Sequence, residues 1–389
     1  MVLQWFYDSA APNFVEIDIR TMNAQTIAGN VLSASGWRYG ALGIQQNRIS
    51  LVPQTPGDPD TNDDVLIIPG FVDLHVHGAG GADVMDSGSP YETLARMHAR
   101  HGTTSLLATT MTAPREEIEA VLAKLGHYIA QSRPPSTARV LGVHLEGPYI
   151  NRGRLGSQPD FAITASLEQL EHQCSLAPLK VVTLAPEIPG HLELVRFLAE
   201  KGIRAQIGHT LATYEQGLQA LESGARGFTH LFNAMTPLNH RAPGMVGAAL
   251  AHADYCELIP DLVHVHPGAL LAALRAIPKA YCVSDSTAGA GMPDGEYRLG
   301  RQRVTKTLGC ARLADGTLAG STLTLDQGLR NLVDLGFSIE AASARVSRYP
   351  ADYLGLTDRG RIEPGAWADL VVLDRKLRPI AVYVEGELV

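Results

Sequence analysis

The stretch from Pro69 to Gly78 reads Pro-Gly-Phe-Val-Asp-Leu-His-Val-His-Gly, and it decides how the rest of the chain is interpreted. Its apolar residues predict a buried β-strand that ends in His75 and His77. Alternate side chains of a strand share a face, so the two imidazoles point the same way and can bind one metal ion. An isolated pair of this kind also fits two ordinary histidines near a strand end. The metal site therefore depends on what the other strands bring.

Between residues 70 and 356, apolar strands alternate with amphipathic helices, which is typical of a parallel α/β domain. Eight strands are expected, at 71–77, 103–110, 139–146, 179–185, 203–209, 227–232, 255–261 and 281–285. Helices between them are expected at 115–129, 192–201, 214–223 and 269–277. This pattern and length predict a distorted (β/α)8 barrel of the TIM type.

The two ends of the chain have a different pattern from the middle. Residues 1–69 contain short alternating pieces such as 14–19 and 39–44, and the alternation returns at 367–374 and 381–389. We expect residues 1–69 and 357–389 to form one small β-sandwich domain, beside a barrel of residues 70–356.

The composition excludes several classes of protein. The chain has 389 residues, 45% of them hydrophobic, and a net charge of −8 without a cluster of Lys and Arg, so we expect no nucleic-acid or membrane partner. We expect neither a secretory leader nor a membrane span, because residues 1–8 lack a basic region and a long apolar core and no apolar run approaches about 18 residues. Four widely spaced cysteines without CxxC spacing indicate buried thiols in a reducing compartment. We therefore expect a cytoplasmic protein.

Metal-compatible side chains recur where the expected strands end. In a (β/α)8 barrel the carboxyl ends of the strands converge on one mouth, where active sites are built. One polar residue at such an end is common, but six at five strand ends predict a metal centre. The six are His75, His77, Glu146, His209, His230 and Asp285.

Histidines and carboxylates suit a divalent ion, with Zn²⁺ as the first candidate and Fe²⁺ as an alternative, at one or two ions per subunit. Such an ion lowers the pKa of water and polarises a carbonyl, as amide hydrolysis requires. A carboxylate can take the proton of the water and pass it to the leaving amine, and Asp285 is the candidate for this catalytic role.

Several motifs together resemble N-acetylglucosamine-6-phosphate deacetylases of the amidohydrolase superfamily. His144-Leu145-Glu146-Gly147-Pro148 and Thr229-His230-Leu231-Phe232-Asn233-Ala234-Met235 are the most specific of them. The first strand, Gly208–Thr210, 283–288, 318–324 and the tail 360–369 also match, whereas about the first 28 residues look different.

The resemblance implies that Glu146, His209 and His230 hold the principal metal and that Asp285 moves the proton. Glu146 could also bridge two ions, because this chain keeps His75 and His77. Hydantoinase-like relatives use a carbamylated lysine as the bridge, whereas this chain offers a glutamate. The resemblance further implies a homodimer.

Substrate contacts are implied less completely. Arg241 and His264 match the residues that contact a sugar phosphate, and the backbone amides of Asn233 and Ala234 would add donors. Gln158 stands where the family typically has a histidine that helps to polarise the substrate carbonyl. It either replaces that donor or indicates another substrate.

These observations predict a metal-dependent enzyme that removes acetate from an N-acetyl amino-sugar 6-phosphate, with N-acetylglucosamine 6-phosphate as the default substrate. N-acetylgalactosamine 6-phosphate differs at one hydroxyl and stays open, as does another N-acyl compound. A catalytically inactive binding barrel is the third hypothesis, which the intact ligand set disfavours.

Overall fold

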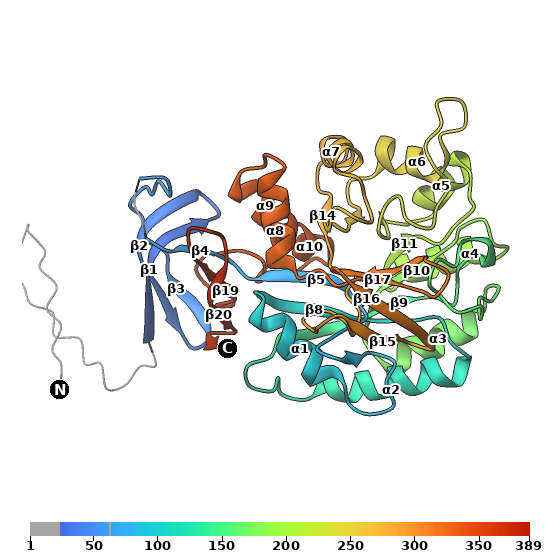
Figure 1. The fold of residues 1–389 in the computed structure, drawn as a ribbon, viewed down its shortest axis with the longest axis horizontal. Helices are drawn as coiled ribbons and strands as arrows, with labels where there is room; N and C mark the ends of the chain where they lie inside the picture. Colours follow the sequence, from blue (N-terminus) through green and yellow to red (C-terminus); the bar gives the residue numbers. More distant parts are fainter. Residues whose placement is uncertain (1–23, 62–63) are drawn as a thin grey trace, which may run out of the picture.

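The computed structural model describes residues 24–61 and 64–389, and its larger part is a distorted barrel of parallel strands surrounded by helices (Figure 1). All eight expected barrel strands are present, although the last four are short. They are β5 Phe71–Val76, β8 Thr103–Thr110, β9 Arg139–Glu146, β10 Leu179–Leu184, β11 Arg204–Ile207, β12 Gly227–Phe228, β13 Glu257–Leu258 and β14 Tyr281–Cys282.

The barrel is closed by irregular junctions. Six strands form one parallel sheet in the order β12-β11-β10-β9-β8-β5, and β13 and β14 form a separate parallel pair. After β12, the amide of Leu231 donates to the carbonyl oxygen of Glu257 at 2.9 Å, and after β14 the amide of Asp285 donates to the carbonyl oxygen of His75 at 2.9 Å. These two bonds join the pair to both edges of the sheet, and they bring the strand ends that carry polar residues together.

Helices cover the outside of the barrel. The buried residues of α2 show why: Ile118, Val121, Leu122 and Leu125 recur at helical spacing and turn one apolar stripe toward the strands. The helices are α1 Tyr91–Arg100, α2 Arg115–Ala130, α3 Leu167–Leu176, α4 His191–Glu200, α5 Tyr214–Glu222, α6 Gly244–His252, α7 Pro267–Ala276, α8 Leu325–Asp334, α9 Ile339–Val346 and α10 Arg348–Tyr353. The four helices expected from periodicity correspond to α2, α4, α5 and α7.

A small sheet domain stands beside the barrel (Figure 1). Its seven strands follow the order β21-β20-β19-β4-β1-β2-β3, so strands from both ends of the chain share one sheet. They are β1 Ala24–Ser33, β2 Gly36–Gln45, β3 Arg48–Leu51, β4 Leu66–Pro69, β19 Leu370–Leu373, β20 Pro379–Val384 and β21 Glu387–Leu388. The domain limits at 69/70 and 356/357 stay a prediction, and the expected piece 14–19 lies outside the described residues.

An antiparallel sheet after β14 was not anticipated from the sequence. Its strands are β15 Gly295–Leu299, β16 Gln302–Thr307, β17 Cys310–Arg312 and β18 Leu318–Ser321. Leu299, Val304 and Ala319 pack against Met111, the residue after β8, so the sheet lies at the carboxyl ends of the barrel strands. Two smaller elements flank the same region: the hairpin of β6 Gly78–Ala79 and β7 Ala82–Asp83, and the 3₁₀ turn Arg152–Arg154.

Within the described residues, none of the helices combines the length and apolar character needed to span a bilayer.

Candidate metal centre

The structure brings together all six side chains expected at the barrel mouth. Each is less than a tenth exposed, and each stands at or just beyond the end of its strand. They divide into two overlapping groups that share one carboxylate.

The first group consists of Glu146, His209 and His230. The Oε1 atom of Glu146 lies 3.1 Å from Nε2 of His209 and 3.0 Å from Nε2 of His230. The two imidazole Nε2 atoms are themselves 3.1 Å apart. Three ligand atoms therefore face one common point.

The second group consists of His75, His77 and Asp285, with the other oxygen of Glu146. The Nε2 atoms of His75 and His77 are 3.1 Å apart, and they lie 3.4 and 3.3 Å from Oδ1 of Asp285. The Oε2 atom of Glu146 is 3.5 Å from Nε2 of His75 and 3.1 Å from Nε2 of His77. The carboxylate of Glu146 thus lies between the two groups.

These separations fit divalent metal ions. Bonds of about 2.0–2.2 Å at the tetrahedral angle place two ligand atoms roughly 3.3–3.6 Å apart, close to the separations found here. Glu146 directs Oε1 at the first group and Oε2 at the second, so its carboxylate belongs to both candidate sites.

The far nitrogens of the rings support the same interpretation. The Nδ1 atom of His77 lies 3.2 Å from the carbonyl oxygen of Thr109, and that of His209 lies 2.8 Å from the carbonyl oxygen of Arg154. A carbonyl oxygen only accepts, so Nδ1 must carry the hydrogen in both rings. In the neutral ring the lone pair is then on Nε2, directed at the centre, as in metal-ligating histidines.

The charges in the centre depend on one another. Burial alone would raise the pKa of Asp285, but His75 and His77 lower it to about 2. Burial would lower the pKa of His77, but hydrogen bonds to Asp285 and Glu146 raise it to about 9. Carboxylates and imidazoles thus neutralise one another at this site. The carboxylates would therefore already be ionised when a metal cation replaces the protons of the imidazole rings.

Three of the six residues have an unusual backbone. His209, His230 and Asp285 have φ values of 47°, 30° and 50°, in the left-handed region that residues other than glycine rarely adopt. Such conformations persist where surrounding structure holds them, often at functional sites. Here they occur where the chain leaves a strand and turns its side chain into the mouth.

Gln158 is buried against the centre. Its Nε2 donates to Oε2 of Glu146 at 2.7 Å, and its Oε1 accepts from the backbone amide of Thr112 at 2.7 Å. The side chain therefore supports the shared carboxylate, and contact with a substrate stays a prediction.

The expected substrate-binding residues are less closely grouped. His264 is held by Asp261, with 2.6 Å between Nδ1 and Oδ2. Burial would lower the pKa of His264, but Asp261, with a smaller contribution from Asp285, raises it. Arg241 is exposed, and its guanidinium forms no hydrogen bond or ion pair within residues 24–61 and 64–389. It is thus free to contact an anion.

Asn233 and Ala234 require one correction. The backbone amide of Asn233 already donates to the carbonyl oxygen of His230 at 3.0 Å, so it is not a free donor for a ligand. The Asn233 side chain also donates to that oxygen, at 3.2 Å. Ala234 has a φ of 52°, and its carbonyl oxygen accepts from the amide of Thr210, the residue after His209, at 3.0 Å.

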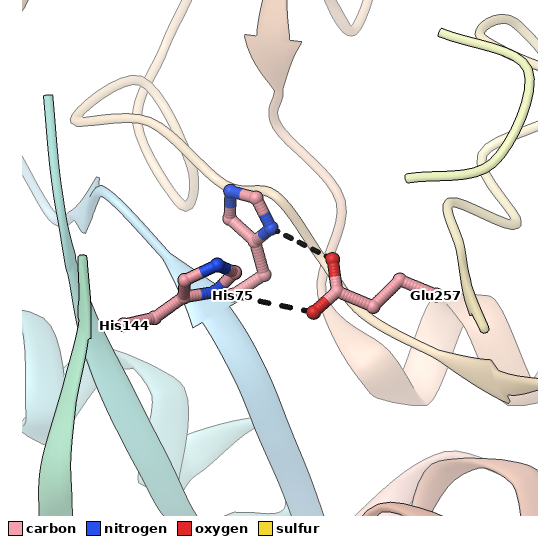
Figure 2. A group of neighbouring side chains, drawn as sticks. All are labelled: His75, His144 and Glu257. Carbon is pink, nitrogen blue, oxygen red and sulfur yellow. Dashed lines mark hydrogen bonds and ion pairs between the residues drawn. The ribbon is translucent and has the colours of Figure 1, made fainter. Parts of the chain in front are cut away.

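Two buried residues beneath the centre were missed in the sequence. Glu257 of β13 accepts from Nδ1 of His75 through Oε2 at 3.0 Å, and Nδ1 of His144 in β9 faces its other oxygen, Oε1, at 3.9 Å (Figure 2). His144 precedes Glu146 by two residues, so strand alternation alone could have placed both in the barrel interior. Glu257 stands inside the apolar run Tyr255–Ile259, where a carboxylate needs buried partners.

The fold and this candidate metal centre indicate a hydrolase, and the comparisons agree. The model of the amidohydrolase family matches residues 66–389, and the chain belongs to this family.

Within this family, the similar proteins include deacetylases of N-acetyl amino-sugar 6-phosphates, which confirms the resemblance inferred from the motifs. The chain is 38% identical over 371 residues to N-acetylgalactosamine-6-phosphate deacetylase of Escherichia coli O157:H7, covering 93% of this chain and 98% of that protein. It is 38% identical over 369 residues to N-acetylglucosamine-6-phosphate deacetylase of Bacillus subtilis, covering 90% and 93%.

Solved structures show the same relationship. N-acetylglucosamine-6-phosphate deacetylase of Thermotoga maritima superposes with a TM-score of 0.86 at 35% identity, over 94% of this chain and 99% of that one. A mutant of the Mycobacterium smegmatis enzyme in complex with N-acetyl-D-glucosamine-6-phosphate gives 0.85 at 31%, with the same coverage.

Proposed function

We propose that this enzyme hydrolyses the acetamide of an N-acetyl amino-sugar 6-phosphate, converting N-acetylglucosamine 6-phosphate to glucosamine 6-phosphate and acetate. The observation that carries the proposal is the buried centre of four histidines and two carboxylates, in a chain whose relatives are named as deacetylases of this kind.

The residues of the centre would hold two divalent ions, with Zn²⁺ as the first candidate and Fe²⁺ as the alternative. Glu146, His209 and His230 would bind one ion, and His75, His77 and Asp285 the other, with Glu146 shared. Bound there, a divalent ion supplies Lewis acidity, which lowers the pKa of water and polarises the amide carbonyl.

Asp285 would move the proton. Its carboxylate is ionised, since its pKa is lowered to about 2, so it can accept a proton from the attacking water as oxygen bonds to the carbonyl carbon. When the carbon–nitrogen bond breaks, the same carboxyl group returns the proton to the leaving nitrogen. Acetate and a free amine result.

Arg241 and His264 would bind the phosphate. An unpaired guanidinium and an imidazole beside Asp261 are suited to a dianionic monoester. Of the two backbone amides first proposed, only that of Ala234 lacks a partner within the described residues, so we assign the further donor to Ala234 and to the second hydrogen of the Asn233 side-chain amide.

The test is acetate release from N-acetylglucosamine and N-acetylgalactosamine, each with and without the 6-phosphate, and from an N-acetyl amino acid. We expect the phosphorylated sugars to have a kcat/KM at least about 100-fold higher than the free sugars, and Arg241→Ala to remove most of that preference. Equal rates for phosphorylated and free sugars would exclude the assigned roles of Arg241 and His264.

The same panel tests the second candidate substrate. The E. coli relative is named for N-acetylgalactosamine 6-phosphate, whose ring differs at one hydroxyl. A higher kcat/KM for that compound would replace the glucosamine assignment and leave the chemistry unchanged.

We also propose a cytoplasmic homodimer. All four cysteines of the chain lie within the described residues and form no disulfide, as is usual in a reducing compartment, and this supports the cytoplasmic location. Leu238, near Arg241, is 56% exposed and would be covered by a second copy. Light scattering of the purified protein measures the mass, and a monomer at micromolar concentration would exclude the dimer.

A further inference from the structure

Glu257 is a fully buried carboxylate that contacts both groups of the proposed centre without directing an oxygen into it. Its Oε2 atom accepts from Nδ1 of His75 at 3.0 Å and from the backbone amide of His230 at 3.2 Å. Figure 2 shows the Glu257 carboxylate facing the His75 ring. Isolated buried carboxylates are very costly, so these partners explain why it is tolerated.

His144 and Glu257 are not a third metal site. Both ring nitrogens of His144 are already engaged, Nδ1 with the carbonyl oxygen of Leu74 at 3.0 Å and Nε2 with Oγ1 of Thr183 at 2.7 Å. The Nδ1 atom of His144 lies 3.9 Å from Oε1 of Glu257, beyond hydrogen-bond distance. His75 offers only Nδ1 on this side, because its Nε2 faces the centre.

Glu257 is held in place from behind. The Tyr281 hydroxyl lies 3.4 Å from its Oε1, and Gln206 donates to that hydroxyl at 2.7 Å. Thr229 in turn donates to Gln206 at 2.9 Å. All of these residues are buried, so the carboxylate has little freedom to turn away from His75.

The partner of His75 differs in charge from those of the other rings. Backbone carbonyls hold Nδ1 of His77 and His209, and Nδ1 of His230 has no partner within the described residues. Of the four rings, only His75 has a carboxylate behind it. An anion on Nδ1–H fixes the tautomer and makes Nε2 a stronger ligand.

We propose that Glu257 is a positioning residue that holds His75 for metal binding, and that its charge strengthens the site of His75, His77 and Asp285 more than the site of His209 and His230. This inference rests on the proposed two-ion centre. It goes beyond the proposed function because it assigns unequal support to the two ions.

The test is Glu257→Gln in the full chain. A glutamine oxygen can take the place of Oε2 and still accept from His75 and His230, so the substitution removes mainly the charge. Zn²⁺ content by mass spectrometry and competition with a chromophoric chelator give the stoichiometry and the two dissociation constants. We expect one zinc dissociation constant, the one that His75→Ala also raises, to increase about 10- to 100-fold, with less than about a threefold change in the other.

The matched control is Asp326→Asn. Asp326 is also a buried carboxylate against a histidine Nδ1, 3.2 Å from His101, but it contacts none of the six residues of the centre. We expect both zinc affinities to match those of the wild type. If Glu257→Gln unfolds, Glu257→Asp is the second variant, because it keeps the charge. It should bind both ions, with a loss of zinc affinity smaller than the roughly 10- to 100-fold loss expected for Glu257→Gln.

Several outcomes would overturn the inference. One is a folded Glu257→Gln whose zinc affinities equal those of the wild type, and another is an equal loss of zinc affinity at both sites. A third is a loss of zinc affinity in Glu257→Asp as large as in Glu257→Gln. The last is a protein that binds one zinc ion with an affinity that His75→Ala does not change. A wild-type protein that binds no zinc and releases no acetate would instead contradict the proposed function. A wild type that binds two ions and is active, with Glu257→Gln unchanged, contradicts only the role of Glu257.

Discussion

Asp285 is the third residue after β14, and it has a left-handed backbone and a carboxylate directed at His75 and His77. Asp285→Asn keeps the size of the side chain but removes the group proposed to accept the proton. We expect kcat to fall about 10²- to 10⁴-fold, because positioned general acid–base groups contribute on that scale. Steady-state acetate release, with zinc content measured on the same sample, separates proton transfer from metal loss.

The control for this substitution is Asp334→Asn, at an exposed aspartate in the last turn of α8. It should leave kcat within about twofold of the wild-type value. Wild-type kcat in Asp285→Asn at full zinc content would show that another group moves the proton.

At the residue scale, the sequence predicted the candidate ligands but not the residues that hold them in place. His75, Glu146, His209 and Asp285 stand at strand ends, so topology alone brings them together. Glu257 lies within a strand, where the sequence shows a charged residue but not which buried groups face it. Partners such as Tyr281 and Gln206 come from other strands, and their directions follow only from three-dimensional packing.

Among the elements, β18 packs closely against the backbone of Asp285 at one glycine, Gly320. Gly320 has a φ of 57°, and a Cβ placed there would lie 2.6 Å from Cγ2 of Thr287 and 3.0 Å from the carbonyl oxygen of Asp285. Gly320→Ala should therefore shift the backbone of Asp285 as well as strain its own. We expect a loss of stability of roughly 1–3 kcal/mol and a clear loss of kcat, measured by urea unfolding and acetate release.

Gly316 provides a matched control in the turn before β18. Its φ is 88°, but a Cβ there would meet nothing within 4 Å. Gly316→Ala should cost only the backbone strain, about 1–2 kcal/mol, and leave kcat unchanged. Equal effects of the two substitutions on kcat would mean that Gly320 does not position Asp285.

The elements differ in how clearly the sequence showed them. The barrel strands were found because they are short apolar runs bounded by helices of regular period. The sheet β15–β18 was missed because its alternation is weak: in Gly295–Leu299 only Leu299 is buried, and the other residues are polar or partly exposed. A sheet that packs one narrow face on the barrel mouth leaves little apolar pattern to read.

At the scale of the whole molecule, the alternating tail predicted that both ends of the chain share one sheet, and β19 does lie between β4 and β20. The contact between this sheet and the barrel could not be read from sequence. It includes a buried ionic cluster at Glu385, which follows β20 and binds three arginines from distant segments. They are Arg133, Arg139 and Arg359.

This cluster predicts how stability depends on pH. Burial would raise the pKa of Glu385, but Arg139 and Arg359 lower it to about 2, below the ordinary value of 4.5. A lowered pKa means that the unfolded chain binds the proton more tightly. The contribution of Glu385 is therefore complete above about pH 4.5 and is lost as the pH falls toward 2. It amounts to roughly 1–3 kcal/mol after allowance for partial exposure.

Glu385→Gln tests this contribution through urea midpoints measured at pH 7 and pH 3. The variant should be much less stable than the wild type at pH 7, because three guanidinium groups lose their shared anion, and the difference should narrow at pH 3. Glu387→Gln is the control: Glu387 also pairs with Arg133, but its side chain is 42% exposed, so we expect less than about 1 kcal/mol at either pH. If the difference in stability between the wild type and Glu385→Gln stays constant from pH 7 to pH 3, the charge of Glu385 does not stabilise the contact between the sheet and the barrel.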